Sequence, residues 1–255
     1  MLRRAVTSRA SAAAGAPRAS DLALMALQAE TLYTCTPEGR LLRDNDPFGV
    51  PQPPRFFLGR TVEGNLWRVR HDLPPALAAR LDELARAEPV CPDAAALAAP
   101  PALLDAARRV LDAAAPISEE WRGPAYALPP ERALPPSPHA VRITPETPAR
   151  LGPAFADLQP YLNEIEPCLV VCEGAQAVAV CFSSRLHPRA AEAGVETRDG
   201  WRRRGYGRAA VAAWAARLRA GGRLPLYSTS WDNHASQALA RSLGFSLFGE
   251  DYSVL

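Results

Sequence analysis

The 255-residue sequence predicts an α+β protein in which helices flank a mixed central sheet, with a further α+β unit towards the N-terminus. Hydrophobic residues make up 48% of the chain, which is enough for a large core. In the second half, apolar runs bounded by glycine alternate with amphipathic segments, a pattern typical of strands and helices. A proline-dense segment ending near residue 138 precedes this regular half. We therefore expect a disordered tail at residues 1–20, an N-terminal α+β domain or cleft-covering extension at 21–138, and a second domain at 139–255.

The N-terminal half contains less regular elements. Apolar spacing predicts a helix with a strand-like end at residues 21–35 and helices at 74–89 and 98–116. Turn residues predict a hairpin or turn region at 36–46 and two strands within 55–74. Residues 122–140 are rich in proline, which disfavours the helical conformation of each preceding residue. We expect this segment to be an extended linker or wall.

The second half predicts a fixed order of elements: strand, helix, three strands, helix, strand, helix, strand. The strands are expected at residues 139–143, 168–174, 177–186, 190–197, 224–230 and 245–255. The first helix, over 148–165, is interrupted by two prolines. The second helix presents Val211, Trp214 and Leu218 on one face, and the third spans 233–244.

Composition excludes several classes of protein. The net charge is only +2, which argues against a broad nucleic-acid surface. No apolar run approaches the ~18 residues that a membrane span requires, so we expect neither a membrane nor a nucleic-acid partner. The five cysteines show no CxxC pair, which favours free thiols in a reducing cytoplasm and predicts no metal site. The basic N-terminal tail has a composition that a transit peptide shares, but we interpret it as disordered.

The most informative stretch is Arg202–Gly207, "RRRGYG", between a predicted strand and a predicted helix. The first N–H groups of a helix have no intrahelical acceptor, and the helix dipole adds positive potential there. Glycines let an anion approach the backbone, so the stretch predicts a phosphate or pyrophosphate site. It is neither a P-loop nor a dinucleotide fingerprint. A nucleic-acid patch would need several basic segments, and only one is present.

The order of elements and two motifs resemble the GNAT superfamily of N-acyltransferases. The family's [RQ]xxGx[GA] pyrophosphate motif corresponds to Arg202–Gly207, after the strand "AGVET". Its second motif corresponds to "STSWDNHASQALARSLGF", Ser228–Phe245, and is similar to a bacterial subgroup with a YSTSWDN signature. The resemblance covers roughly residues 139–255, whereas the first 138 residues resemble nothing as clearly. It implies a GNAT fold and transfer of an acyl group from acyl-CoA, usually acetyl-CoA, to a primary amine by direct attack in a ternary complex.

The resemblance also implies which residues bind acetyl-CoA, the co-substrate. The pyrophosphate would lie among the backbone N–H groups and side chains of the first motif, and the pantetheine arm would pair with a splayed strand. An exposed N–H near Val195 or Glu196 would polarise the thioester carbonyl. Asn233 would hold the pantetheine arm, or would only cap the next helix, a role that asparagine favours in any case. The implied cofactor-binding residues are Val195, Thr197, Arg202, Arg203, Arg204, Gly205, Tyr206, Gly207, Arg208, Asn233 and Ser236.

The reaction needs a base to accept a proton from the amine. Glu196 is the first candidate because it ends the strand beside the splay, and Glu192 is the second because it lies on the same face; either is otherwise a solvated carboxylate. His187 and His234 are weaker candidates. The family often uses a tyrosine as general acid where this chain has Ala240. Either Tyr227, Tyr252 or Ser236 substitutes for it, with Tyr227 our prediction, or solvent protonates the thiolate, whose pKa in water is about 8–9.

The alternative to an enzyme is a non-catalytic GNAT-like module that binds CoA, which Ala240 favours slightly. The acceptor is not readable from the sequence, because acceptor loops vary freely on such folds. As a hypothesis, residues 21–138 wall the acceptor cleft. The sequence leaves open whether the chain is a monomer or a homodimer.

Overall fold

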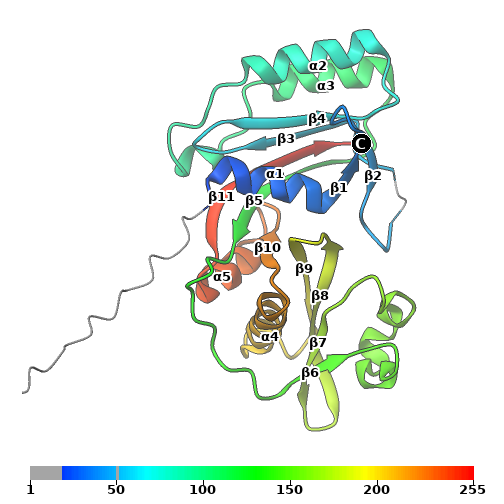
Figure 1. The fold of residues 1–255 in the computed structure, drawn as a ribbon, viewed down its shortest axis with the longest axis vertical. Coiled ribbons are helices and arrows are strands. Elements are labelled where there is room, and N and C mark those ends of the chain that lie inside the picture. The colour runs from blue at the N-terminus through cyan, green and yellow to red at the C-terminus, as the bar shows by residue number, and fades with distance from the viewer. Residues whose placement is uncertain (1–18, 50–51) are drawn as a thin grey trace, which may run out of the picture.

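The computed structural model describes residues 19–49 and 52–255 (Figure 1). Nearly all of the tail predicted at 1–20 therefore lies outside the described residues. The N-terminal elements are α1 (Asp21–Leu32), β1 (Tyr33–Cys35), β2 (Leu41–Asp44), β3 (Phe56–Arg60), β4 (Asn65–Val69), α2 (Pro75–Ala87), η1 (Ala95–Ala98), α3 (Leu104–Ala114) and β5 (Glu120–Ala127). The predicted helices and strands of this half are confirmed, and β5 is an addition.

The C-terminal elements follow the predicted order. They are β6 (Ala140–Ile143), η2 (Pro148–Leu151), η3 (Pro153–Tyr161), β7 (Cys168–Glu173), β8 (Gln176–Leu186), β9 (Ala190–Thr197), α4 (Tyr206–Ala220), β10 (Leu224–Ser228), α5 (His234–Leu243) and β11 (Ser246–Val254). Helix α4 buries Val211, Trp214 and Leu218, as its spacing predicts.

Two proline-rich segments differ in detail from what the sequence predicts. The proline-dense segment predicted as a linker contains β5, where Pro124 and its neighbours pair with β11. The predicted helix over 148–165 is a pair of 3₁₀ segments, because Pro153 and Pro160 interrupt the α-helical hydrogen-bond ladder. Both differences occur in proline-rich sequence, where the local composition does not reveal the backbone conformation that tertiary contacts determine.

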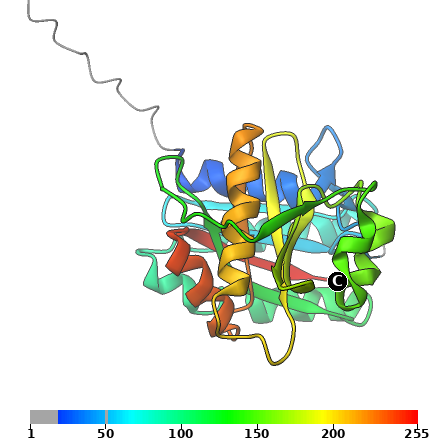
Figure 2. The ribbon, with the colours of Figure 1, turned by 90° about the horizontal axis from the view of Figure 1, so that it is seen from below.

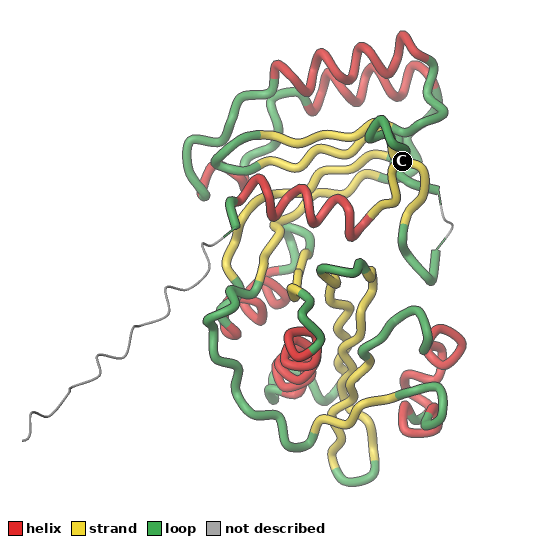
Figure 3. Tube along the Cα trace, viewed as in Figure 1, coloured by secondary structure: helices red, strands yellow, loops and turns green. Residues whose placement is uncertain are grey.

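Within the described residues, nine strands form one mixed sheet in the order β4-β3-β11-β5-β10-β9-β8-β7-β6. Strands β1 and β2 form a separate hairpin. Strand β5 pairs antiparallel with β10 on one side and with β11 on the other. The other neighbour of β11 is β3. The N-terminal half therefore supplies strands inside the C-terminal sheet. In Figure 3, β3, β4, β5 and β11 lie in the upper part of the molecule, and β6 to β9 lie below them at a different inclination.

Helices cover both faces of this sheet. On one face, α2 and α3 pack on Phe56 and Leu58, while α4 and α5 pack on Tyr126 and Tyr227. On the other face, α1 packs on the alternate residues of the same strands, including Phe57. The segment from η2 to η3 also covers this second face, opposite α4 (Figure 2). The predicted α+β architecture, a mixed sheet flanked by helices, is confirmed.

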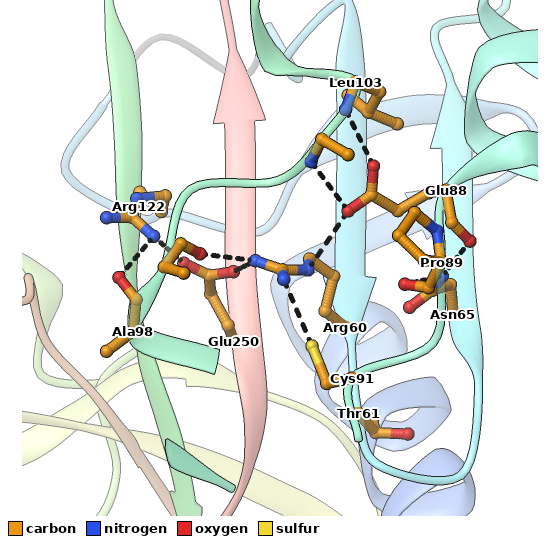
Figure 4. Close-up of polar contacts among 12 residues, drawn as sticks. Arg60, Thr61, Asn65, Glu88, Pro89, Cys91, Ala98, Leu103, Arg122 and Glu250 are labelled. Atoms are coloured by element: carbon orange, nitrogen blue, oxygen red, sulfur yellow. Dashed lines mark hydrogen bonds and ion pairs between the residues drawn. The ribbon is translucent and has the colours of Figure 1, made fainter. Parts of the chain in front are cut away.

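A buried ionic network joins the two halves (Figure 4). Glu250 on β11 is fully buried and accepts hydrogen bonds from Arg60 of β3 at 2.5 Å and from Arg122 of β5 at 2.6 Å. Trp231, in the loop after β10, donates its indole N–H to the same carboxylate at 2.8 Å. Arg60 also pairs with Glu88 at the end of α2. The loop after β10 is therefore anchored to strands from the first half.

Gly123 of β5 lets this loop pass close to the sheet. A Cβ atom at this position would lie 1.8 Å from the carbonyl oxygen of Thr229 and 2.9 Å from Cα of Ser230. Both obstacles are backbone atoms, so no side-chain rotation can relieve the contact.

We expect Gly123→Ala to lower the free energy of unfolding by about 2 kcal/mol or more, because the added methyl group must displace the loop from β5. Urea unfolding followed by circular dichroism measures this change. Gly174→Ala is the matched control: nothing lies within 4 Å of its added Cβ, and only its φ of 57° costs about 1 kcal/mol. Equal effects of the two substitutions would contradict the close contact.

Candidate functional site

Strands β9 and β10 are paired over only part of their length. They run parallel and pair from Ala190 to Glu192 on β9 and from Leu224 to Leu226 on β10. Beyond Glu192, β9 stays paired with β8 alone, while β10 pairs with β5. The two strands therefore separate after Glu192, which confirms the predicted splay.

The separated part of β9 presents backbone groups to the gap. Arg198 donates its N–H to the carbonyl oxygen of Val178 on β8. In an antiparallel pair, every second residue of a strand bonds to the neighbouring strand, so the residues of β9 that bond to β8 here are the even-numbered ones. Val195 and Thr197 lie between them, and their N–H and C=O groups face the gap. Glu196 turns its own N–H towards β8. Of the two N–H groups that the resemblance offers for polarising the thioester carbonyl, only that of Val195 therefore faces the gap.

The turn between β9 and α4 depends on two glycines for different reasons. Gly205 has a φ of 86°, a conformation that glycine adopts without strain. Gly207 is in the helix, where a Cβ atom would lie 2.8 Å from the Thr197 hydroxyl oxygen. The first glycine therefore makes the turn, and the second lets α4 lie close against β9. Arg203 also has a positive φ, 63°, so the turn holds this side chain in an uncommon backbone conformation.

The N-terminus of α4 offers free donors and arginines. The first intrahelical bond runs from Ala209 N–H to the Gly205 carbonyl oxygen, which leaves the preceding N–H groups without an intrahelical acceptor. Arg202, Arg203 and Arg208 line the adjacent cavity, and all three are exposed. Arg204 does not line it: its guanidinium lies 5.2 Å from the centre of the Trp201 ring.

This cavity, the α4 cavity, has a volume of about 980 Å³ and begins where β9 and β10 separate. It collects every predicted cofactor-binding residue except Arg204, together with Glu196 and Tyr227 of the predicted catalytic set. The lining residues that the sequence predicted are Val195, Glu196, Thr197, Arg202, Arg203, Gly205, Tyr206, Gly207, Arg208, Tyr227, Asn233 and Ser236.

The start of α5 contributes a polar group to this cavity. Asn233 caps the helix, because its side-chain oxygen accepts the N–H of Ser236 at 3.0 Å. The cap leaves the Asn233 amide nitrogen available to a ligand. The Ser236 hydroxyl lies 2.6 Å from the Tyr227 hydroxyl. Burial raises the pKa of Tyr227 to about 12, so this phenol keeps its proton at neutral pH.

A second cavity, the acidic cavity, has a volume of about 810 Å³ and meets the α4 cavity at Asn233, which lines both. Residues from both halves of the chain line it. They include Tyr33, Asp44, Asp46, Phe57, Glu119, Trp121, Arg185, Glu192, Ser228 and Asp251. The sequence singled out only Glu192 in this set. Asp251 gave no signal, because it lies in the last strand, beyond the end of the second motif.

Glu192 stands at the point where β9 and β10 separate. Its side chain is 4% exposed, and its Oε1 accepts the backbone N–H of Ser228 across the gap. Burial raises the pKa of Glu192 to about 7, against the opposing effects of the Ser228 hydrogen bonds and of Arg185. Asp251 is 1% exposed, and burial, with the charge of Glu192 added, raises its pKa well above the usual value. A carboxylate with a pKa near 7 is suited to accept a proton at neutral pH.

The other predicted acid–base candidates lie in different surroundings. Glu196 is exposed beside the α4 cavity, and partial burial together with Asp157 raises its pKa. His187 lies in the β8–β9 turn and His234 is exposed, and neither lines the two cavities. The Tyr252 hydroxyl donates to Glu120 on another part of the sheet.

Comparison with known families matches residues 150–255 to the model described as GNAT acetyltransferase. These residues carry β9, the glycine turn, α4 and the capped α5. Residues 150–255 are a GNAT acetyltransferase domain. In GNAT terms, Ala240 takes the place where the family often has a tyrosine, and it is fully buried in the core under α4 and α5.

Solved structures similar to the chain include other GNAT proteins. A GCN5-related N-acetyltransferase-like protein from Streptococcus suis has 17% identity and a TM-score of 0.41, over 54% of this chain and 62% of its own. A GNAT-family acetyltransferase from Colwellia psychrerythraea has 14% identity and a TM-score of 0.42, over 55% and 58%. A tandem GNAT protein from the clavulanic acid biosynthesis pathway has 18% identity and a TM-score of 0.44, over 91% of both chains. The match thus spans less than two thirds of the first two structures, and no curated protein matches the chain.

None of the helices in residues 19–49 and 52–255 is both long and apolar enough to cross a membrane. Over the same residues, no cluster of three or more histidine, cysteine or acidic side chains forms a metal site. All five cysteines are free thiols, and Cys91, Cys168 and Cys181 are buried.

The raised pKa of Glu192 predicts a dependence of stability on pH. Between about pH 4.3, where a glutamate titrates in the unfolded chain, and pH 7, the folded state binds more protons than the unfolded state. Raising the pH through this window should therefore lower the free energy of unfolding, by up to about 3 kcal/mol from this group. Arg185, Asp251 and Tyr227 are the charged or titratable groups that interact with it.

Glu192→Gln should flatten this dependence, because glutamine still accepts the Ser228 N–H but does not titrate. Urea unfolding at pH 5, 6, 7 and 8 measures the slope for both proteins. Glu83→Gln, at an exposed position on α2, is the control and should keep the wild-type slope. Parallel curves for wild type and Glu192→Gln would contradict the raised pKa.

Proposed function

We propose that the protein is an acetyl-CoA-dependent N-acetyltransferase that transfers the acetyl group to a primary amine by direct attack in a ternary complex. One observation carries the proposal. The β9 edge, the α4 turn and the α5 cap line a single cavity, and at Asn233 this cavity adjoins a second one, which is lined by Glu192, a buried carboxylate of raised pKa at the point where β9 and β10 separate.

The α4 cavity fits the chemistry of a CoA molecule. Its pyrophosphate would accept hydrogen bonds from the free N–H groups at the start of α4, where the helix dipole also favours an anion. The missing side chain of Gly205 keeps this approach open, since nothing lies within 4 Å of its Cβ position. Arg203 and Arg208 would add charge-assisted bonds from the rim.

The gap between β9 and β10 fits the pantetheine arm. That arm carries amide groups, and the C=O and N–H groups of Val195 and Thr197 face the gap with no strand opposite them. The Asn233 amide nitrogen lies beside the same gap and would donate to an arm carbonyl. An extended arm in this position would act as a short additional strand between β9 and β10.

Acetyl-CoA, when bound, supplies the acetyl group as a thioester. Among the chain's own groups, the Val195 N–H faces the gap and would donate to the thioester carbonyl oxygen. Glu192 would take a proton from the amine, so that the neutral nitrogen can attack the carbonyl carbon. The new C–N bond forms as the C–S bond breaks, the leaving thiolate takes a proton from a general acid, and the second proton from the nitrogen then restores that acid.

Tyr227 is the group that we assign to protonate the thiolate. It lines the α4 cavity, it keeps its proton at neutral pH, and it shares a hydrogen bond with Ser236. Ala240 is buried in the core, so the position that carries the family's usual tyrosine has no chemical role in this chain.

Calorimetric titration with acetyl-CoA and with desulfo-CoA tests the cofactor site. We expect micromolar binding of both ligands. Arg208→Glu should weaken it by about tenfold or more, because it replaces a phosphate-binding charge with a repelling one. Arg217→Glu, an exposed arginine in the last turn of the same helix, is the matched control and should bind as wild type does. Failure of wild type to bind either ligand would overturn the proposal.

Kinetics separate an enzyme from a non-catalytic CoA-binding module. We expect Glu192→Gln to lower kcat for amine acetylation by about 100-fold or more, because a general base contributes roughly 10²–10⁴-fold. The affinity for acetyl-CoA should change little. Glu196→Gln is the matched comparison, and its exposed carboxylate should matter much less. Thiol release from acetyl-CoA measures the rates of both variants. A larger loss of kcat in Glu196→Gln than in Glu192→Gln would identify Glu196, and not Glu192, as the general base. Tight acetyl-CoA binding without turnover on any amine would favour the non-catalytic module.

A further inference from the structure

The acidic cavity contains two buried carboxylate oxygens without a partner. Glu192 Oε2 and Asp251 Oδ1 have no hydrogen-bond partner among the described residues, although their side chains are almost fully buried and line the cavity. Leaving such oxygens unpaired is costly, and native structures rarely tolerate it without a ligand or water. Both groups therefore call for a hydrogen-bond donor from inside the cavity, and a positively charged donor would suit them best.

The one arginine that lines this cavity is already engaged. Arg185 donates to Asp44 at 2.9 Å and pairs with Asp46 at 3.0 Å, so its guanidinium belongs to the cavity wall. Of the five carboxylates that line the cavity, the remaining three, Glu119, Glu192 and Asp251, form no ion pair with this arginine, although its charge opposes the rise in the pKa of Glu192. Even if Glu192 and Asp251 share one proton, the cavity stays negative and would repel an acidic ligand.

The outer part of the cavity suits a second positive group. Trp121 of β5 is half-buried and lines the cavity, and Glu119, directly before the start of that strand, lines it too and is exposed. An aromatic ring beside a carboxylate attracts an ammonium group through both cation–π and Coulomb interactions. The volume of about 810 Å³ has room for a molecule much longer than a simple amine.

We infer that the acceptor is a small molecule with two or more amino groups, a di- or polyamine, which binds in the acidic cavity with one terminal amino group at Glu192 and Asp251. This inference rests on the proposed acetyltransferase function. The reacting ammonium donates to Glu192 Oε2 and Asp251 Oδ1 and loses one proton to this pair before attack. The second ammonium lies near Trp121 and Glu119.

Gln28 of α1 is the positioning residue in this arrangement. Its side-chain amide is fully buried and donates to Asp251 Oδ2 at 3.1 Å, which leaves Oδ1 for the substrate. Helix α1 belongs to the N-terminal half, so that half supplies the support of Asp251 as well as Tyr33, Phe57 and Trp121 in the cavity wall. The acceptor site is thus assembled from both halves.

A series of acceptors with equal chain length tests the substrate class: 1,4-diaminobutane, 1-aminobutane and 4-aminobutanoate. They carry a distal positive, neutral or negative group beside the same primary amine. We expect kcat/KM to fall in that order, by about tenfold at each step, because the cavity is negatively charged. Linear polyamines and aminosugars both carry several amino groups. Comparing kcat/KM for spermidine with kcat/KM for a 2-deoxystreptamine aminosugar distinguishes these two classes of acceptor.

Two variants locate the two amino groups. Asp251→Asn should lower kcat/KM about tenfold or more for both the diamine and the monoamine, and should leave acetyl-CoA affinity unchanged. Glu119→Gln should lower the preference for the diamine over the monoamine a few-fold at low ionic strength, because the distal ammonium group loses a carboxylate partner. Exposed Glu83→Gln is the matched control and should change neither.

The outcomes separate this inference from the function on which it rests. Binding of acetyl-CoA with 4-aminobutanoate as good an acceptor as the diamine would overturn the polyamine class alone. The polyamine class would also be overturned if the protein binds acetyl-CoA but neither acetylates nor binds any polyamine in calorimetry. Acetylation of a lysine-containing peptide alone would overturn it as well. An unchanged kcat/KM in Asp251→Asn would overturn the role of Asp251. Absence of acetyl-CoA binding would instead overturn the acetyltransferase proposal itself.

Discussion

Strand β5 holds the structure together, because it lies between β10 and β11 and hydrogen-bonds to both. Its pairing with β10 leaves the far half of β9 without a partner, and that unpaired edge is the gap on which the site is built. Its pairing with β11 places Asp251 on the same face as Glu192 and Glu250 on the opposite face. The Glu250 network then fixes the loop from β10 to α5, and through it the position of Asn233.

The site combines two cavities of different chemistry at one break in the sheet. The α4 cavity offers N–H donors and arginines, whereas the acidic cavity offers carboxylates and aromatic rings. Asn233 lines both, and Glu192 lines the acidic cavity at the point where β9 and β10 separate. An anionic co-substrate and a cationic acceptor would therefore meet from opposite sides, each held by the charge that suits it. Burial of Glu192, rather than a nearby like charge, is the largest cause of its raised pKa.

The sequence was sufficient where the structure is local. The turn at Gly205 and the cap at Asn233 are set within a few residues, so motif and spacing predicted them, whereas the splayed strand was expected from the family resemblance. The sequence was insufficient where partners come from far away. Strand β5 contains Pro124 in a proline-dense segment and looks like a linker, because only its neighbours β10 and β11 make it a strand. Asp251 and Gln28 are 223 positions apart, and no periodicity could have joined them. The ranking of Glu196 ahead of Glu192 has the same origin, since burial of Glu192 depends on α1 and β11.

The neighbours of β11 have a consequence for the order in which the chain is made and folded. Both of them, β3 and β5, come from the first half, and β11 follows every other element in the sequence. During synthesis, β3 and β5 are therefore complete long before the strand that separates them exists. Their facing edges must stay unpaired, or be protected, until β11 enters between them. Residues 150–255, which match the family model, therefore share their sheet with strands that lie outside that match.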